Sequence, residues 1–270
     1  MTLAIVFKGP EGVVLAADSR VTLQFQVAGT NAVMSAHYDN ATKLLKVQGQ
    51  EHVAAVTYGL GVLGAIEPRT AHSFLPEFEA ALNASKRGRL SVKDFADQLS
   101  AFFMSQHAAS QTPANAGDMF FLVGGYNEGE PYGRVFEVAV PSAPAPVEHN
   151  TGIFGIRWGG QSEITARVLN SLDGGMIQSL KTRFNLDDVQ TRQLVDEMQA
   201  EHALRIPFQF LPLQDCVDLS ILLIETTAQL MQYIVGVRGV GGAIDVATIT
   251  RTDGYRPVQV KSVKGKRYEA

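Results

Sequence analysis

Short apolar runs bounded by turn residues recur along the chain. The runs at 3–7 and 13–17 are separated by the segment 8–12 (KGPEG), which carries the glycine and proline of a tight turn. This pattern predicts a β-hairpin at the start of the chain. Other runs of the same kind are predicted as strands: 42–47, 52–58, 119–124, 134–140 and 151–158.

Apolar residues recur every three or four positions over 68–82 and 91–106, which predicts two amphipathic helices. Ser91 stands three residues before Asp94, a capping pattern that is typical of the first turn of a helix. The remaining segments are predicted in this order: two or three helices within 161–204 with glycines at 174 and 175 between them, a strand at 217–225, a helix at 226–235, and strands at 244–249 and 256–263.

Strand pairs and helix pairs alternate along the chain as blocks. Blocks of this kind predict antiparallel sheets stacked face to face, with helices covering both outer faces. We therefore expect an α+β fold, a four-layer αββα sandwich. No segment has the length and composition of a linker, so residues 1–270 are expected to form one domain. The proline-rich segment 141–146 is expected to be a stiff surface loop between two strands.

The composition argues against several classes of function. The chain has 270 residues, 46% of them apolar and 19% charged, and its net charge of −4 provides no basic excess for nucleic acid phosphates. The single cysteine, Cys216, excludes an internal disulfide framework and is typical of a reducing compartment. The sequence shows no signal peptide, no apolar run of membrane-spanning length, and no metal-binding spacing among its six histidines. We therefore expect a cytoplasmic protein that needs no metal or cofactor and binds neither nucleic acid nor membranes.

The candidate chemistry lies at the start of the chain. Thr2 follows Met1, and a small second residue permits removal of the initiator methionine, so the mature chain can begin with threonine. A threonine hydroxyl needs a base within hydrogen-bonding reach, and an α-amine, with a reference pKa of about 7.7–8.0, can serve as that base. Lys43 would add a fixed positive charge, and Asp18 would hold the lysine in place. Each feature alone is common, because position 2 is often small and an Asp-x-Arg after a strand is usually a surface ion pair.

Taken together, these features resemble a known family. The segments that carry the resemblance are 16–22 (AADSRVT), 42–47 (TKLLKV), 56–61 (VTYGLG) and 123–126 (VGGY). They are similar to the β-subunits of the proteasome and to the bacterial HslV-type peptidases, and most of all to the betaproteobacterial proteasome homologue, a relative of HslV. The resemblance covers most of the chain and implies an N-terminal nucleophile hydrolase fold.

The resemblance implies a role for each matched residue. Thr2 would attack the peptide bond, with Asp18 and Lys43 as its catalytic partners. Arg20 would support Asp18, and Thr22 would hold the main chain of the substrate. A main-chain amide between Thr57 and Gly59 would help to form the oxyanion hole, where one donor is typically worth about 10²–10³ in rate.

Three departures from the family pattern concern the surroundings of this site. The segment between Thr22 and Lys43 is about nine residues longer than in the family, and its inserted part, 23–40, is a candidate for a chamber entrance or substrate channel. Gly159 stands where the family has a serine, and whether Ser162 takes over the role of that serine stays open. The family's later Asp-x-x-Ser is best matched by the segment 215–218 (DCVD), which makes Asp215 the expected supporting residue and Asp218 the second choice.

The resemblance implies a threonine-type endopeptidase subunit that cleaves peptides or unfolded proteins inside a self-assembled chamber. Its partners would be copies of itself in stacked homo-oligomeric rings, a 14-mer or a 12-mer, and the need for an ATP-dependent unfoldase stays open. Two alternatives remain: a non-catalytic ring subunit of the same fold, and an N-terminal nucleophile amidohydrolase that acts on small amides. Activity on peptides compared with small amides would separate them.

Overall fold

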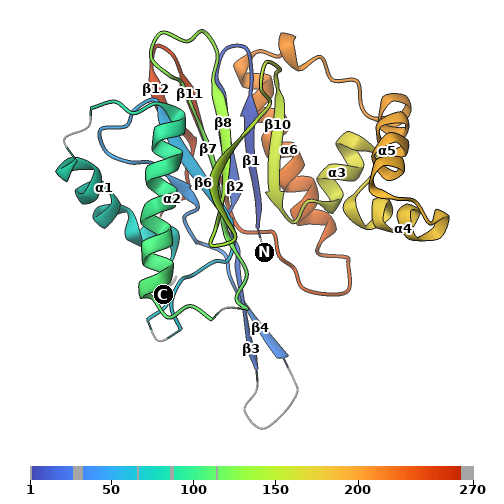
Figure 1. The fold of residues 1–270 in the computed structure, drawn as a ribbon, viewed down its shortest axis with the longest axis horizontal. Helices are drawn as coiled ribbons and strands as arrows, with labels where there is room; N and C mark the ends of the chain where they lie inside the picture. Colours follow the sequence, from blue (N-terminus) through green and yellow to red (C-terminus); the bar gives the residue numbers. More distant parts are fainter. Residues whose placement is uncertain (1, 27–32, 66, 86–87, 114, 263–270) are drawn as a thin grey trace, which may run out of the picture.

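The computed structural model describes residues 2–26, 33–65, 67–85, 88–113 and 115–262. These residues form two five-stranded sheets, stacked against each other, and a two-stranded ribbon that extends from one end of them (Figure 1). Every strand pair is antiparallel. The protein therefore has a mixed α/β fold built on antiparallel sheets.

The first sheet holds the N-terminal hairpin. Its strands, in spatial order, are β10 (Gly155–Gly160), β1 (Leu3–Lys8), β2 (Val13–Asp18), β11 (Ile244–Thr250) and β12 (Gly254–Gln259). Every residue of β1 and β2 is buried, because both faces of this sheet are covered. The predicted opening hairpin is confirmed, and the N–H of Gly9 closes its turn by donating to the carbonyl of Gly12.

The second sheet follows the chain order. Its strands are β5 (Leu44–Leu45), β6 (Val53–Gly59), β7 (Met119–Gly125), β8 (Arg134–Val140) and β9 (Ala143–His149). Only the two residues of β5 pair within the strand expected at 42–47. The prediction that the proline-rich segment 141–146 is a loop is wrong, because residues from Ala143 onward form the start of β9. This strand lies at the edge of the sheet, where a proline without an N–H is tolerated.

The ribbon consists of β3 (Val21–Gln26) and β4 (Val33–Tyr38). No strands were predicted there, although the strict alternation of apolar and polar residues over Val21–Gln26 is a strand signal that was missed. The ribbon covers most of the inserted segment 23–40. It leaves the body of the protein directly after β2, close to the N-terminus of the chain (Figure 1).

The helices lie on the outer sides of the two sheets (Figure 1). They are η1 (Ala71–Phe74), α1 (Leu75–Ala84), α2 (Val92–Ala109), α3 (Glu163–Asn170), α4 (Gly174–Phe184), α5 (Asp188–His202), η2 (Phe208–Phe210) and α6 (Leu213–Leu230). The predicted cap of α2 is confirmed, because the Ser91 hydroxyl accepts the N–H of Asp94 at 3.0 Å. No helix in the described part of the chain is both long and apolar enough to cross a membrane.

Three clusters of buried apolar side chains hold these layers together. One lies between the two sheets and contains Val6 and Leu122. A second joins the first sheet to α6, and a third joins the second sheet to α1 and α2. Each sheet therefore buries both of its faces, and the ends of the central strands are left to carry polar groups.

Helix α6 corrects the prediction of a strand at 217–225 followed by a helix at 226–235. A continuous apolar run can belong to a buried strand or a buried helix, and periodicity alone does not separate them. In the structure the buried positions of this segment recur at intervals of one, three and four: Cys216, Val217, Ser220, Leu223, Ile224 and Thr227. The segment is therefore a single helix with one face against the first sheet.

Candidate active site

Thr2 lies immediately before β1 and is almost completely buried, with 4% of its surface exposed. Its carbonyl accepts the N–H of Gln161 at 2.7 Å, which ties the start of the chain to the end of β10. Gly160, the last residue of β10, has φ +96°, and a β-carbon there would overlap the Thr2 carbonyl. The close approach of β10 therefore requires a glycine and fixes the position of Thr2.

Asp18 ends β2 beside the start of β1, and its side chain receives four hydrogen bonds. Oδ1 accepts from the Leu3 N–H at 3.1 Å and from Nζ of Lys43 at 2.8 Å. Oδ2 accepts from the N–H groups of Arg20 at 3.1 Å and Gly241 at 3.0 Å. With 1% of its surface exposed, this carboxylate is held in one orientation from every side.

Lys43 lies directly before β5, and its amine is buried between two acceptors. Nζ donates to Oδ1 of Asp18 at 2.8 Å and to the carbonyl of Arg20 at 2.6 Å. Burial lowers the pKa of Lys43, and the neighbouring Asp18 only partly opposes this effect. The Asp18 carboxylate and the Arg20 carbonyl stabilise the charged form of this buried amine.

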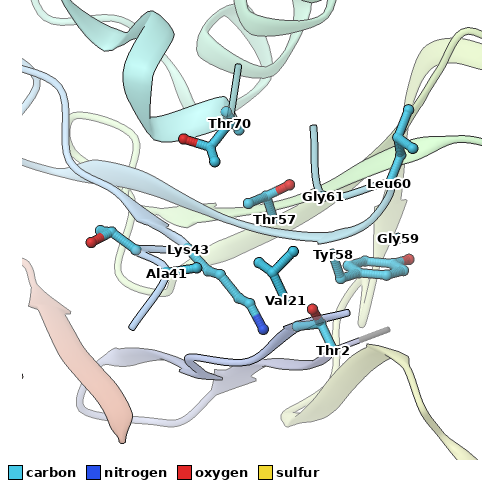
Figure 2. Close-up of a pocket in the computed structure, with 12 residues that line it drawn as sticks. Thr2, Val21, Ala41, Lys43, Thr57, Tyr58, Gly59, Leu60, Gly61 and Thr70 are labelled. Carbon is cyan, nitrogen blue, oxygen red and sulfur yellow. The ribbon is translucent and has the colours of Figure 1, made fainter. Parts of the chain in front are cut away.

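Thr2 and Lys43 line the same cavity, which has a volume of about 20 Å³. Figure 2 shows the Lys43 amine and the Thr2 side chain close to each other at this space; Thr2 lies before β1 and Lys43 before β5. Thr57 and Gly59 line it as well. The other lining residues are mainly apolar or glycine: Val21, Ala41, Thr42, Tyr58, Leu60, Gly61, Thr70 and Ala71. The structure thus brings the predicted nucleophile and Lys43 together in one small pocket, with Asp18 behind Lys43.

Arg20 lies behind the pocket and does not line it. Its guanidinium pairs with Asp39 at 2.6 and 2.8 Å, which raises the pKa of Arg20 and lowers the pKa of Asp39. Gly241 packs against it so closely that a β-carbon would lie 2.7 Å from Cζ of Arg20. Thr22 also lies outside the pocket lining, and its hydroxyl pairs with Nδ1 of His37 across the ribbon.

Thr57 is not a free main-chain donor. Its N–H donates to the carbonyl of Lys43 at 3.0 Å, and its hydroxyl donates to the carbonyl of Phe120 at 3.1 Å. The N–H of Leu60 is likewise donated to Asp118. The prediction that the Thr57 N–H is an oxyanion donor is therefore wrong for this chain. Gly59 has φ +80°, and a β-carbon there would lie 2.5 Å from the carbonyl of Asp118, so this position requires glycine.

The Tyr58 ring packs directly against the main chain of Gly159. A β-carbon on Gly159 would overlap this ring, so a serine would not fit there. The Tyr58 hydroxyl donates to Glu137 on β8, and the ring stacks on Phe120. Burial raises the pKa of this phenol far above its ordinary value. Ser162 makes no side-chain cap on α3 and lines a neighbouring cavity.

Asp215 and Asp218 do not approach Thr2, so the prediction of either as a supporting residue is wrong. Both lie in the first turns of α6, beside the turn between β1 and β2, where the N–H of Leu213 donates to Glu11. This turn is at the opposite end of the six-residue strand β1 from Thr2, a distance of about 20 Å. Asp218 instead accepts from Gln214 on its own helix.

The support that sequence reasoning missed comes from the glycine-rich segment 235–242. The Gly241 N–H donates to the Asp18 carboxylate, and the Gly241 carbonyl accepts the N–H of Ser19. Paired glycines that let one main chain approach another were the available signal. Among the described residues, no three His, Cys, Asp or Glu side chains gather to hold a metal ion.

Comparisons with known proteins found similarity only among solved structures. No family model and no curated protein matches this sequence. The structure titled "Anbu (ancestral beta-subunit)" from Yersinia bercovieri has a TM-score of 0.55 and 14% identity, over 95% of this chain and 86% of that chain. An Anbu (Gly-1) mutant from Hyphomicrobium sp. strain MC1 has a TM-score of 0.52 and 15% identity, over 96% of this chain and 86% of that chain.

These comparisons correct the predicted assignment to the HslV-type peptidases and the betaproteobacterial homologue. The structures named here are Anbu proteins, and no sequence match supports an HslV-type assignment. Identities this low establish the fold alone. The chain shares the fold of these Anbu structures, and its predicted place among the HslV-type peptidases is wrong.

Proposed function

We propose that this protein is a threonine-type endopeptidase subunit in which Thr2, freed from Met1, is the nucleophile. The observation that carries the proposal is the buried pair of Lys43 and Asp18, with Nζ and Oδ1 2.8 Å apart, whose lysine lines the same small pocket as Thr2. Burying two charges is costly unless the arrangement has excellent geometry. A charged pair kept beside a buried N-terminal threonine fits a catalytic role better than a structural one.

The chemistry follows from these groups. The α-amine of Thr2 takes the proton of the Thr2 hydroxyl as the oxygen attacks the carbonyl carbon of the substrate. The resulting tetrahedral intermediate expels the amine of the leaving peptide, which receives that proton, and leaves an acyl ester on Thr2. Water then attacks the ester with the same amine as base. The Lys43 ammonium, oriented by Asp18, favours the alkoxide form of Thr2.

The oxyanion of the intermediate needs main-chain donors near Thr2. The amides of Thr57 and Leu60 are already bonded to other carbonyls. We therefore assign the donor to the main chain of Gly59 or Gly61, both of which line the pocket, because the Tyr58 main chain pairs with Phe120 in the β6–β7 ladder. Arg20 acts from behind the pocket, through the orientation of its carbonyl toward Lys43.

The neighbours' printed description as a β-subunit supports a proposal on architecture and assembly. Residues 1–270 would form one N-terminal nucleophile hydrolase domain with the four-layer αββα arrangement, and copies would assemble into stacked rings. Large apolar side chains that are exposed in the single chain would be covered by neighbouring copies; they include Phe210, Tyr233, Ile234 and Val235. A stable monomer in sedimentation at micromolar concentration contradicts this assembly.

The small pocket favours one alternative strongly enough to be tested beside the peptidase. The space next to Thr2 holds little more than one water molecule, and so tight a site favours a small amide over a bulky peptide side chain. Activity of the processed protein is measured on a panel of peptides and on small aliphatic amides. Cleavage of the peptides supports the peptidase, whereas cleavage of the small amides alone supports the alternative.

The decisive test concerns Met1. While Met1 is attached, the Thr2 nitrogen is an amide and cannot act as a base. Protein with and without Met1 is separated, its mass is measured intact, and peptide hydrolysis is compared. We expect activity only in the fraction that begins at Thr2. Equal rates in both fractions overturn the mechanism.

A further inference from the structure

Helices α4 and α5 form a helical hairpin that has almost no core. No residue of α4 is buried, and Thr191 is the single buried residue of α5. The two helices pack mainly against each other, and Figure 1 shows them at the outer edge of the molecule, beyond α3. Helices of 11 and 15 residues gain little stability in water without a packed face. This α4–α5 hairpin is therefore expected to pack against another surface.

The two ends of the hairpin lie far apart. Its root lies beside α3, where the N–H of Leu204 donates to the carbonyl of Leu169 at 3.1 Å. Its tip is the turn 184–187, which joins α4 to α5. The 11 residues of α4 span about 16 Å, which separates the tip from the root. The tip is thus held away from the body of the protein.

An exposed aromatic ring stands at the tip. Phe184 is the last residue of α4, and 60% of its surface is exposed. A single exposed apolar side chain is common on a protein surface. This ring is informative because the same chain carries an apolar cavity of matching size at the root of the hairpin.

The cavity lies between α3, α6 and the segment 204–206, and its volume is about 150 Å³. Its walls are aliphatic apart from Thr165 and Thr226. The exposed side chains of Val168, Leu204 and Leu222 belong to its lining, so the cavity opens at the surface. Apolar cavities of about this volume stay dry and bind benzene. The α3–α6 cavity therefore fits the phenyl ring of one phenylalanine.

Phe184 does not reach the cavity of its own chain, because the tip lies about 16 Å from the root. A second copy, related by a two-fold axis across the middle of the hairpin, would place each tip over the root of the other copy. Each copy then inserts one ring and receives one ring. The ring and the cavity thus make this surface self-complementary.

The charges of the hairpin favour the same arrangement. At the tip, Lys181 pairs with Asp188 at 2.5 Å, and Arg183 stands directly before the aromatic ring. The last two turns of α5, next to the root, carry three acidic side chains: Asp196, Glu197 and Glu201. They outnumber the basic Arg205 that follows them. Acidic side chains are unfavourable at the C-terminal end of a helix, and a cation from a second copy offsets this effect.

We propose that the α4–α5 hairpin is a two-fold contact surface for a second copy of this chain, in which Phe184 of each copy enters the α3–α6 cavity of the other. This inference rests on the proposed assembly of identical copies and does not depend on the chemistry of Thr2. A two-fold contact pairs copies, whereas closed rings need head-to-tail contacts on other surfaces. The hairpin therefore joins the two stacked rings to each other.

Sedimentation at micromolar concentration tests this contact through the mass of the particle. Phe184→Ala removes the ring, and Leu222→Trp places a larger side chain at the opening of the cavity. Both positions are exposed in the single chain, so the free energy of unfolding should change little. Each variant is expected to halve the mass of the particle. Tyr132→Ala is the matched control, because Tyr132 is an aromatic residue of similar exposure, 51%, in the turn before β8.

The outcomes separate this contact from the proposed assembly. Halved mass in Phe184→Ala and in Leu222→Trp, with full mass in Tyr132→Ala, supports the contact. If the wild type assembles and either variant keeps its full mass, this inference alone is overturned. Dissociation of Phe184→Ala to less than half of the mass also overturns it, because the contact would then hold each ring together. A monomeric wild type overturns the proposed assembly and, with it, the inference.

Discussion

Arg20 and Asp39 form a two-point ion pair that joins the end of β2 to the base of the β3–β4 ribbon. Nε of Arg20 lies 2.6 Å from Oδ1 of Asp39, and Nη2 lies 2.8 Å from Oδ2. The main-chain carbonyl of Arg20 accepts from Nζ of Lys43. Asp39 belongs to the segment that is longer than in the resembling family. In the proposed mechanism it is a positioning residue, which acts on Lys43 through Arg20.

Asp39→Asn tests this positioning role. The pair is partly exposed, so its loss is expected to lower the free energy of unfolding by no more than about 1 kcal/mol. Because the Arg20 main chain is then less firmly placed, kcat should fall about three- to tenfold with little change in KM. Urea unfolding and peptide hydrolysis measure the two effects. Asp253→Asn is the control, since it breaks a pair with Arg256 in a distant turn. An unchanged kcat in Asp39→Asn removes this residue from the positioning set.

The same pair predicts a pH dependence. The Arg20 side chain holds the pKa of Asp39 below its ordinary value. The unfolded chain therefore takes up this proton at a higher pH than the folded chain, near the reference value of about 3.9. The stabilisation is fully present above that pH and is lost as the pH falls through the lower folded value. The difference in unfolding free energy between wild type and Asp39→Asn should shrink as the pH falls below about 4. A difference that grows as the pH falls contradicts the assignment.

Removal of the charge beside Thr2 should nearly abolish turnover. Lys43→Met keeps most of the side-chain volume but removes the ammonium, and Asp18→Asn removes the carboxylate that orients it. We expect losses in kcat of about 10²-fold or more in each variant, since both remove a group that assists proton transfer. Peptide hydrolysis and sedimentation are measured together, so that loss of assembly is separated from loss of catalysis. Near wild-type rates in a correctly assembled variant exclude that residue from the catalytic set.

Gly159→Ala tests whether Tyr58 excludes a side chain at this position. The added β-carbon would overlap the Tyr58 ring, so the ring or β10 must shift, and we expect the free energy of unfolding to fall by about 1–3 kcal/mol. Gly174→Ala is the control, because nothing lies within 4 Å of a β-carbon there. A double-mutant cycle with Tyr58→Ala should recover most of the loss. Independent, additive effects of the two substitutions contradict the contact.

A peptide epoxyketone should identify the nucleophile. Only a residue at the chain terminus offers both a hydroxyl oxygen and a free α-nitrogen, so the inhibitor should form two bonds to Thr2 and close a ring. Cys216 is the main competitor, but it is buried, and burial raises its pKa to about 11, which keeps the thiol protonated. Mass spectrometry compares the N-terminal peptide with the peptide that contains Cys216. An adduct on any peptide other than the N-terminal one rejects Thr2 as the nucleophile.

Elements whose formation depends only on neighbouring residues could be predicted from the sequence. The glycine and proline of 8–12 predict the first hairpin, because they permit only a few turn geometries. Ser91 and Asp94 predict the start of α2, because their hydrogen bond closes within one turn. Motif spacing also placed Asp18 beside Lys43, since one residue ends β2 and the other lies directly before β5.

Other features depend on partners that are far away in the sequence. The apolar run at 217–225 is compatible with a strand or a helix by composition, and only packing against the first sheet makes it a helix. Asp215 matches a family motif, yet it lies in the first turn of α6, at the end of β1 opposite Thr2. Gly241 reaches Asp18 across 223 positions, a contact that no spacing rule contains.

The sequence by itself determined which residues are available for chemistry and how short segments fold. The tertiary structure decided which of these residues meet. Tyr58 fills the space beside Gly159, and Thr57 gives its N–H to Lys43, so two positions expected to take part in catalysis have structural roles. The physical reason is that most main-chain donors form hydrogen bonds within the fold, and most of the interior space is filled by packed side chains. Only polar groups at the strand ends stay available to act on a substrate.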